Sequence, residues 1–220
     1  MNVKKKLQKK PAALAKRKIK RYNKREGKKK ESACVETEKS KIAPGRVILP
    51  AELRQPATRL APWLLGKILC RRNGTEVLRF ELTETECYFG EEDSACHAHR
   101  GRTPRTATLY LPGGVAYVYL CYGMHSLLNI VTGEEGHPEA VLVRGVRGVS
   151  GPGRVTKQLG ITRAQNALPL TPESGLWLED PGTGAPDFTA LPRVGIDYAD
   201  PADRDRPWRF LAGETPRRKK

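Results

Sequence analysis

The stretch CRRNGTEVLRFELTETECY, residues 70–88, consists of two strand-like runs on either side of Asn73 and Gly74. An Asn-Gly pair between such runs is a strong signal for a tight β-hairpin turn, because both residues tolerate positive φ angles. The stretch therefore predicts an antiparallel hairpin with a long second strand, and with it a mainly antiparallel sheet.

Alternate side chains of the second strand point to opposite faces, so the sequence assigns each residue to a side. One face is predicted to begin with apolar residues and to end in two carboxylates and a tyrosine: Leu78, Phe80, Leu82, Glu84, Glu86 and Tyr88. Carboxylates that continue a core face mark the point where that face opens into a cleft. A half-buried carboxylate near aromatic rings can have a raised pKa and activate water, which makes this strand end a candidate general-base site. The plain alternative is a charged strand end.

Further elements follow from apolar periodicity and from glycine-rich turns around the hairpin. Residues 57–69 are expected to form a helix, because their apolar side chains fall on one stripe. Residues 115–133 are expected to form two strands with a turn near Gly123, and residues 150–161 a short helix. One further strand is expected in each of the ranges 139–149, 192–198 and 207–213. Together they predict an α+β fold, a single domain with a curved, mainly antiparallel sheet, packed helices and a protruding hairpin.

The formal net charge of +16 is concentrated at the two ends of the chain. Residues 1–30 contain twelve Lys, three Arg and one Glu, which give +14, and the tail 217–220 adds +4. The body between them therefore sums to −2. A like-charge block of this kind stays disordered and acts as an interaction arm. A nucleic-acid-binding arm is the favoured interpretation, and a solubility tail or a targeting signal is the alternative. The expected organisation is a Lys-rich arm and linker at 1–45, a folded domain at 46–214 and a basic tail at 215–220.

Composition and cysteine usage exclude several classes of protein. The N-terminal block has no apolar segment of a secretory signal, and no apolar run approaches the 18 residues of a membrane-spanning helix. Five cysteines, an odd number without a C-x-x-C pair, indicate free thiols in a reducing compartment. We expect an intracellular monomer without a membrane partner, in the cytoplasm or nucleoid of a bacterium or in the nucleus of a eukaryote.

Four of the seven tyrosines fall at the end of the long strand and in the next strand pair: Tyr88, Tyr117, Tyr119 and Tyr122. Aromatic faces in a polar setting suit stacking on nucleobases, which contributes about 1–3 kcal/mol per base. Ordinary sheet tyrosines are the alternative interpretation.

Two other patterns carry weaker signals. The cysteines and histidines within 87–99 match no C-x-x-C or H-x(3–5)-H ligand spacing, so no metal is expected, and His97 is expected to hydrogen-bond or stack in the cleft. The segment SGPGRVTKQ lacks the G-x-x-x-x-G-K-[ST] pattern of a Walker phosphate loop. Its backbone N–H groups at a helix start can hold a DNA phosphate, and a plain helix start is an equal alternative.

Several strings together resemble one enzyme family. The chain contains, in this order, LLGKIL, ETECYFGEEDSACHA, RTPR, YVYLCYGMHSLLNIV, AVLVRGV and GPGRVTKQLGI. Over residues 46–214 it is similar to the alkylpurine (3-methyladenine) DNA glycosylase family, of the methylpurine-DNA glycosylase type. The resemblance implies a monofunctional enzyme that flips damaged purines out of double-stranded DNA, hydrolyses the N-glycosidic bond and leaves an abasic site, with no metal or other cofactor. No lysine lies near Glu86 in the sequence, which argues against a Schiff-base lyase step.

The resemblance also implies roles for individual residues. Glu86 is the expected catalytic base, with Arg144 and the backbone carbonyl of Val194 positioning the water. Asn129 is expected to discriminate against the amino group of guanine, and Tyr122 to insert into the minor groove. The residues expected to line the pocket for the flipped base are Tyr88, His97, Tyr117, Tyr119 and Asn129. The other expected DNA contacts are Met124, Arg105, Arg154 and Lys157.

Three departures from the family pattern bear on the substrate range. Cys87 stands where the family often has Ala, Thr106 stands where it often has Asn, and the segment Gly145–Ser150 is shorter than in many members. The Thr106 difference is expected to alter a DNA contact. The alternative function is that of a binding protein, either a catalytically retired glycosylase fold or a basic RNA-binding protein that uses the tyrosines as a platform. Intact Glu86 and Arg144 favour the enzyme.

Overall fold

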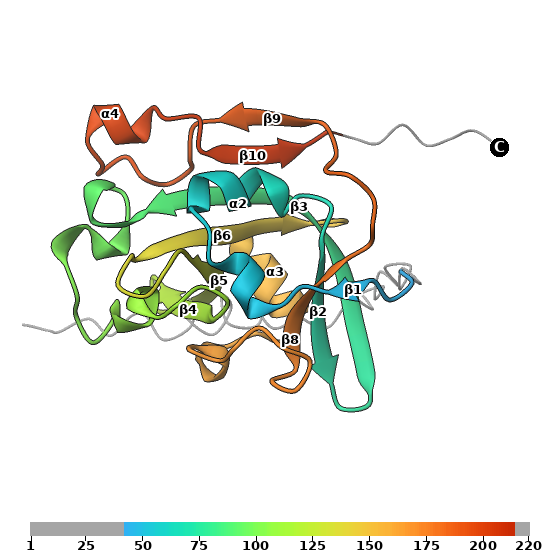
Figure 1. Cartoon of the computed structure of the whole chain (residues 1–220). Coiled ribbons are helices and arrows are strands. Elements are labelled where there is room, and N and C mark those ends of the chain that lie inside the picture. The colour runs from blue at the N-terminus through green and yellow to red at the C-terminus, as the bar shows by residue number, and fades with distance from the viewer. Residues whose placement is uncertain (1–41, 214–220) are drawn as a thin grey trace, which may run out of the picture. The chain divides into compact units, whose positions relative to one another are not determined.

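The computed structural model describes residues 42–213, which belong to one compact unit. The expected arm up to residue 41 and the tail from residue 214 lie outside the described residues. Within the described part, ten strands form a sheet whose pairings are all antiparallel (Figure 1). The strands are β1 (Arg46–Val47), β2 (Ile68–Asn73), β3 (Glu76–Phe89), β4 (Ala116–Cys121), β5 (His125–Thr132), β6 (Glu139–Val146), β7 (Val149–Ser150), β8 (Leu176–Asp180), β9 (Phe188–Leu191) and β10 (Arg209–Ala212).

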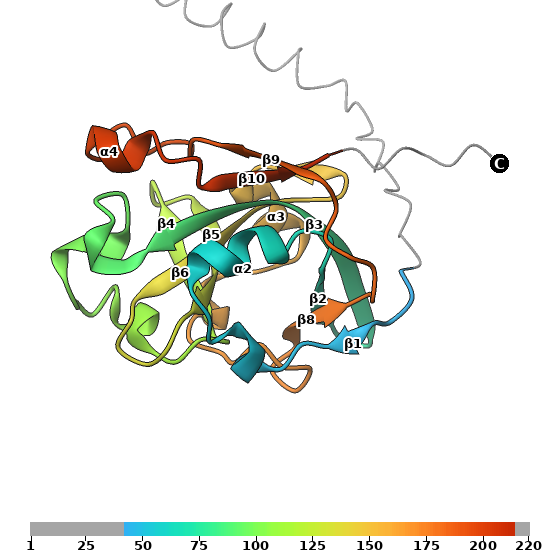
Figure 2. The ribbon, with the colours of Figure 1, turned by 45° about the horizontal axis from the view of Figure 1, so that its top comes forward.

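Strand β3 is the hub of the sheet. Its first half pairs with β2, and its second half pairs with β6 on one side and with β10 on the other. The order then runs from β2 to β8 and β1, and from β6 to β5 and β4. Strand β9 lies beside β10 (Figure 2), and the short β7 folds back on β6 in a tight hairpin that forms the shortened segment after β6. The prediction of an α+β fold with a mainly antiparallel sheet is confirmed.

The predicted hairpin in residues 70–88 is confirmed, with its turn one residue later than expected. The last pair of the β2–β3 ladder is Asn73 with Glu76, so Gly74 and Thr75 form the two-residue loop. Asn73 therefore belongs to the strand.

Helices α2 (Ala57–Trp63) and α3 (Pro152–Gln158) pack on the sheet, α2 against β3 and β6 and α3 against β5 and β6. The third α-helix of the described part is α4 (Pro201–Arg204), which Figures 1 and 2 place beyond the β9–β10 pair. The expected helix over 57–69 is too long, because Gly66 has φ +80° and Ile68 already begins β2. The short 3-10 helices are η1 (Pro50–Leu53), η2 (Gly90–Glu92), η3 (His97–Arg100), η4 (Ala107–Tyr110) and η5 (Arg163–Gln165).

The prediction that one face of β3 runs unbroken from Leu82 to Glu86 is wrong. The register of β3 against β6 shifts between Leu82 and Glu84 and again between Glu84 and Thr85. Such a bulge exchanges the side chains that point to the two faces. Leu82 and Thr85 consequently both face the core, where the Thr85 hydroxyl donates a hydrogen bond to the carbonyl of Ala61 in α2 at 2.7 Å. Glu84 and Glu86 turn to the opposite face.

Two further sequence expectations have a clear outcome. The strand expected at 192–198 is wrong, because β9 ends at Leu191 and the following residues form a loop that bonds to side chains across the molecule. The strand expected within 207–213 is β10. The four cysteines of the described part are free thiols: Cys70, Cys87, Cys96 and Cys121.

Candidate active site

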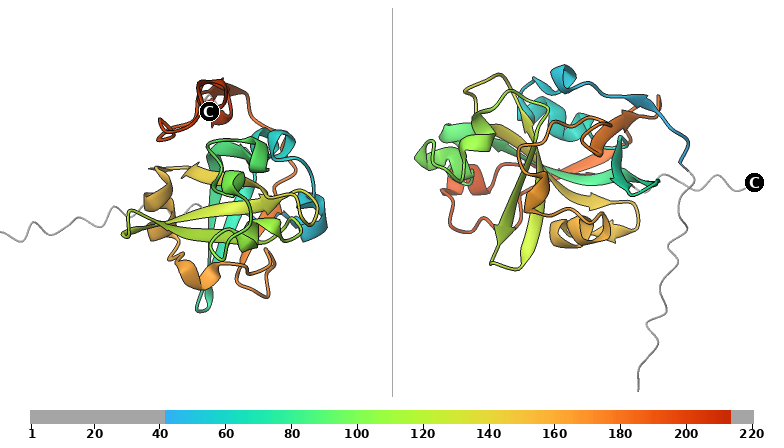
Figure 3. Two further views of the ribbon diagram at one scale, coloured as in Figure 1. Left: turned by 90° about the vertical axis from the view of Figure 1, so that its left-hand side faces the viewer. Right: turned by 90° about the horizontal axis from the view of Figure 1, so that it is seen from below.

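Strands β3, β6, β5 and β4 lie side by side in this order in the sheet, and their two faces carry different side chains. Figure 3 shows the molecule from two further directions. Register partners join Glu86 to Leu142, Leu142 to Asn129 and Asn129 to Tyr117. Because cross-strand partners project to the same side, these four side chains form one row across the sheet. Their neighbours along the strands belong to the main hydrophobic core: Cys87, Val143, Ile130 and Val118.

A cleft of about 510 Å³ opens on the face that carries this row. This volume lies within the range of small-molecule binding sites. Glu86 is fully buried behind the cleft, whereas Met124, Arg154 and Lys157 are exposed outside its lining. The predicted site residues that line the cleft are Arg144, Val194, Tyr88, His97, Tyr117, Tyr119, Asn129, Tyr122 and Arg105.

The Glu86 carboxylate accepts two hydrogen bonds. Oε1 accepts from the backbone N–H of Val194 at 2.8 Å, and Oε2 accepts from the Tyr88 hydroxyl at 3.0 Å. Burial raises the pKa of Glu86 above its ordinary value, although the charge of Arg144 and the two hydrogen bonds act to lower it. A carboxylate with a raised pKa is a better proton acceptor near neutral pH than an ordinary glutamate.

Arg144 lies between two carboxylates. Its Nε is 3.2 Å from Oε1 of Glu84, and its Nη1 is 3.5 Å from Oε1 of Glu86. Arg209 also contacts Oε1 of Glu84, at 3.1 Å. The bulge in β3 therefore has a functional consequence, because it turns both carboxylates toward one guanidinium that lines the cleft.

Three aromatic rings line the part of the cleft nearest β4. Nδ1 of His97 lies 3.0 Å from the Tyr117 hydroxyl, and the His97 ring is edge-on to Tyr119 with centroids 4.5 Å apart. The guanidinium of Arg105 is 5.7 Å from the centroid of the Tyr119 ring. Burial, aided by the charge of Arg105, lowers the pKa of His97 to about 4, so the imidazole is neutral at pH 7. A neutral aromatic wall of this kind suits a purine ring.

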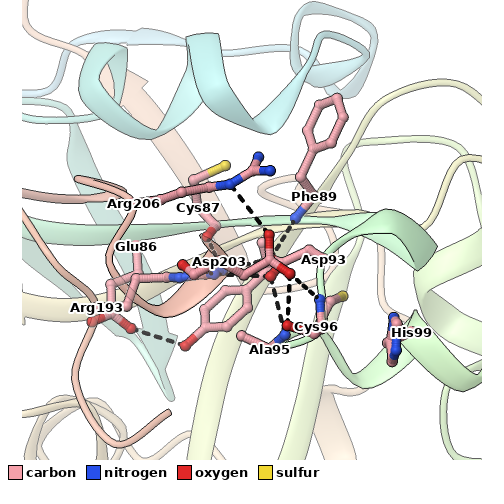
Figure 4. Close-up of polar contacts among 12 residues, drawn as sticks. Glu86, Cys87, Phe89, Asp93, Ala95, Cys96, His99, Arg193, Asp203 and Arg206 are labelled. Carbon is pink, nitrogen blue, oxygen red and sulfur yellow. Dashed lines mark hydrogen bonds and ion pairs between the residues drawn. The ribbon is translucent and has the colours of Figure 1, made fainter. Parts of the chain in front are cut away.

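A buried ionic network, which we name the Arg193 clasp, joins two loops beside the cleft (Figure 4). It consists of Arg193, Asp93, Ser94 and Asp203. Arg193 donates to both carboxylate oxygens of Asp93 and to the backbone carbonyls of Cys87 and Asp203. Both the N–H and the hydroxyl of Ser94 donate to Asp203. The clasp therefore holds the chain after β9 against the end of β3.

Each loop of the clasp carries a residue of the cleft. His97 follows the Asp93 loop, whose backbone is further fixed by hydrogen bonds from the N–H groups of Phe89 and Ala95 to Asp93. Val194 follows Arg193 directly. Asp93 therefore fixes the loop that leads to His97.

Sequence reasoning does not identify Arg193, Asp203 or Tyr198 as site residues. Tyr198 lines the cleft, and its hydroxyl donates to the carbonyl of Ala95 at 2.9 Å. An arginine inside the apolar run PRVGI is the one sequence signal that points to this segment. Its partner Asp93 lies 100 positions away, so no local pattern connects the two.

The β4–β5 hairpin ends in an exposed turn. Tyr122 is 89% exposed and Met124 is 74% exposed. Tyr122 has φ 48° and Gly123 has φ 70°, and the N–H of Met124 closes the turn on the carbonyl of Cys121 at 3.1 Å. A tyrosine with positive φ is sterically unfavourable, and such strain is concentrated at functional positions.

Two residues singled out from the sequence have structural roles in the described part. Thr106 is buried, and its hydroxyl oxygen accepts the N–H of Thr103 at 2.8 Å and bonds to the carbonyl of Gly101. The side chain is therefore committed to its own loop, and an effect of this position on a DNA contact stays a prediction. Cys87 packs in the main core.

Residues 42–213 contain no cluster of three or more His, Cys, Asp or Glu side chains arranged to hold a metal ion. No helix in that part of the chain is long and apolar enough to cross a membrane.

Comparisons with known proteins agree on one family. The family model for methylpurine-DNA glycosylase matches residues 51–216. An Arabidopsis thaliana protein named DNA-3-methyladenine glycosylase is 43% identical over 190 residues, which cover 77% of this chain and 73% of the relative. A Psychrobacter cryohalolentis protein named "Putative 3-methyladenine DNA glycosylase" is 41% identical over 186 residues, which cover 71% of this chain and 87% of the relative.

Proposed function

Because the chain belongs to the methylpurine-DNA glycosylase family, we propose that it excises damaged purines from double-stranded DNA. The observation that carries this proposal is Glu86, a fully buried carboxylate with a raised pKa, which Val194 and Tyr88 hold beside an aromatic cleft. The products are a free purine and an abasic site in the duplex.

The cleft fits a base that has left the helix. The sugar carbon of a stacked base is inaccessible to an enzyme, so the nucleotide must be extruded at a cost of a few kcal/mol. The rings of His97, Tyr117 and Tyr119, together with Tyr88, form the surface on which the extruded purine stacks. Asn129, whose side-chain amide donates to the Tyr117 carbonyl at 3.3 Å, is held in this surface and rejects the amino group of guanine.

Glu86 acts as the general base. It takes a proton from a water molecule, the water oxygen bonds to C1′ of the sugar, and the electron pair of the N-glycosidic bond leaves with the purine. Arg144 and the backbone carbonyl of Val194 position this water. An alkylated purine is cationic and leaves readily, so one carboxylate suffices where ordinary glycosidases use two.

The enzyme is proposed to be monofunctional. A lyase step needs a lysine or another amine that can form a Schiff base with the sugar. The described part of the chain has two lysines, Lys67 and Lys157, and neither lines the cleft. Lys67 instead pairs with Asp180 at 2.9 Å.

The DNA interface is proposed to surround the β4–β5 hairpin, which protrudes into the minor groove. Tyr122 fills the gap left by the extruded nucleotide, since an aromatic wedge replaces the lost stacking. The other proposed contacts are Met124, Arg105, Arg154 and Lys157. The enzyme acts as a monomer, with a folded domain at 46–214 and a Lys-rich arm at 1–45 that adds charge to the DNA contact.

The test is a duplex that carries one hypoxanthine or one ethenoadenine, in which excision creates a site that alkali cleaves. The unaltered protein should cleave, and Glu86→Gln should bind the lesion yet excise at least about 100-fold more slowly, the low end of general-base effects. Glu84→Gln is the matched control, because Glu84 contacts Arg144 without touching Val194 or Tyr88, and its loss should be smaller. Lesion binding without any excision by the unaltered protein would replace this proposal with the retired, binding-only fold.

A further inference from the structure

A buried cation lies against the ring of Tyr88. Cζ of Arg193 is 4.8 Å from the centroid of that ring, and the Arg193 side chain has no exposed surface. Tyr88 lines the cleft, whereas Arg193 does not. The guanidinium therefore contacts a ring of the cleft lining without belonging to the lining itself.

The surroundings of Arg193 fix it in this position. Its second aromatic neighbour is Trp208, with Cζ 5.1 Å from the ring centroid, so the guanidinium contacts two rings. The terminal nitrogens are held by Asp93 and by two backbone carbonyls, while Nε is buried without a hydrogen-bond partner within the described residues. A guanidinium held in this way cannot move off the ring unless the clasp breaks.

A cation on one face of an aromatic ring changes what the other face attracts. The ring face is electron-rich and attracts positive charge, so Arg193 already satisfies part of this attraction. A cationic purine stacked on Tyr88 would be attracted less strongly by the ring and would also be repelled by the positive charge of Arg193. A neutral purine would stack without that penalty.

We propose that Arg193, acting through the ring of Tyr88, sets the selectivity of the cleft between neutral and cationic purines. Arg193 touches no substrate in this scheme and is a positioning residue. The inference rests on the proposed function, since it assumes that a purine stacks on Tyr88, and it adds a residue that controls which class of damaged purine is preferred.

Three variants separate the charge of Arg193 from its structural role. The double variant Asp93→Asn with Arg193→Gln removes both charges of the buried pair and leaves no unpaired ion. Asp93→Asn alone leaves the positive charge without its counter-charge. Arg193→Lys retains the positive charge but loses the planar fork, so it damages the clasp without removing the cation. Thermal unfolding followed by circular dichroism shows which variants are folded.

The readout is the ratio of single-turnover excision rates for two duplexes, one with hypoxanthine, which is neutral, and one with 3-methyladenine, which is cationic and lacks the amino group that Asn129 is proposed to reject. The double variant should shift the ratio toward 3-methyladenine by about two- to five-fold, the size of a cation–π effect. Asp93→Asn should shift it toward hypoxanthine, and Arg193→Lys should leave it within about two-fold of the unaltered protein.

A merely structural role for Arg193 would slow both lesions together and leave the ratio unchanged. An unchanged ratio in the folded double variant, or the same shift in Arg193→Lys, overturns the proposal. If the double variant does not fold, Asp93→Asn provides the test. A ratio in Asp93→Asn that does not move toward hypoxanthine also overturns the proposal. Absence of excision of either lesion by the unaltered protein would instead overturn the proposed function.

Discussion

Val194 donates its backbone N–H to Oε1 of Glu86 at 2.8 Å, although 108 positions separate the two residues in the chain. The donor belongs to the main chain, so its position depends on the path of the loop and not on the half-exposed side chain of Val194. The resemblance implied a role for the carbonyl of Val194 near the water, and that role stays a prediction. The N–H contact adds a direct link from this loop to the proposed base.

We expect Val194→Pro to reduce excision by about 10- to 100-fold. Proline has no N–H, and a hydrogen bond to a charged group contributes about 1.5–3 kcal/mol. Val194→Ala keeps the N–H and is the control, with excision close to that of the unaltered protein. Single-turnover rates at pH 7, with thermal unfolding to verify the fold, measure the difference. Equal rates in the two variants would show that the N–H has no part in holding Glu86.

The pH dependence of excision reports on Glu86. The base must be deprotonated, so the rate should rise with pH through the raised pKa of Glu86, at a higher pH than for an ordinary glutamate. Tyr88→Phe removes a hydrogen bond that lowers this pKa, so the rise should move to still higher pH. The measurement uses 3-methyladenine, which is already cationic and lacks the amino group of guanine, at saturating enzyme. A profile in Tyr88→Phe that moves to lower pH would contradict the assignment.

His97 should make the folded protein less stable in acid. The unfolded chain binds a proton at His97 near the ordinary value of 6.5, whereas burial lowers the pKa of the folded protein to about 4. The unfolded state therefore holds more protons between these values, and the free energy of unfolding falls as the pH falls from about 6.5 to about 4. Urea unfolding at pH 7 and at pH 5 gives the loss of unfolding free energy on acidification, which should be smaller for His97→Gln than for the unaltered protein. The exposed His125→Gln is the control and should show the loss of the unaltered protein. An equal loss in His97→Gln and in the unaltered protein would count against a buried neutral imidazole.

Tyr122 is expected to be required for function although its positive φ angle strains the backbone. Asn adopts positive φ more readily than Tyr, so Tyr122→Asn should leave the thermal unfolding midpoint unchanged or raise it. The same variant should weaken base extrusion for every lesion, because the stacking that it loses is common to all substrates. A fluorescent base opposite thymine measures the extrusion, and Leu49→Ala, at an exposed apolar residue outside the proposed DNA interface, is the control. Unimpaired extrusion in Tyr122→Asn would exclude the wedge.

The arm is expected to control the salt dependence of DNA binding. Residues 1–30 carry +14, and each neutralised phosphate contributes about −0.9 to the slope of log K against log salt. Deletion of residues 1–40 should flatten this slope for undamaged duplex by several units. Single-turnover excision at saturating enzyme should barely change, because the proposed cleft residues all lie beyond residue 80. Identical slopes for the full-length and truncated proteins would favour a targeting or protein-partner role.

Local sequence patterns predicted much of the frame of the site. The hairpin of residues 70–88 and the paired strands around Gly123 follow from turn chemistry and apolar patterns that involve neighbouring residues only. Such features depend on interactions over a few residues, so the local sequence contains what is needed to infer them.

The bulge in β3 could not be predicted in this way. A bulge changes the register between two strands, and the apolar pattern of one strand does not show whether that strand contains a bulge. Alternation from Leu82 therefore placed Glu86 where the core face was expected to open into a cleft, whereas the pairing with β6 turns Glu86 to the opposite face, and the cleft lies there. The error concerns the very residue on which the proposed mechanism depends.

By itself the sequence determined the antiparallel hairpin, the family motifs with their candidate base Glu86, and the separation of a basic arm from a nearly neutral body. Only the tertiary structure decided which face Glu86 occupies, which N–H holds it, and that Arg193 contacts the ring of Tyr88. The reason is the range of the interactions. Turns and alternation are fixed by adjacent residues, whereas these contacts join residues about 100 positions apart, and they form only when the whole sheet and its loops have closed around them.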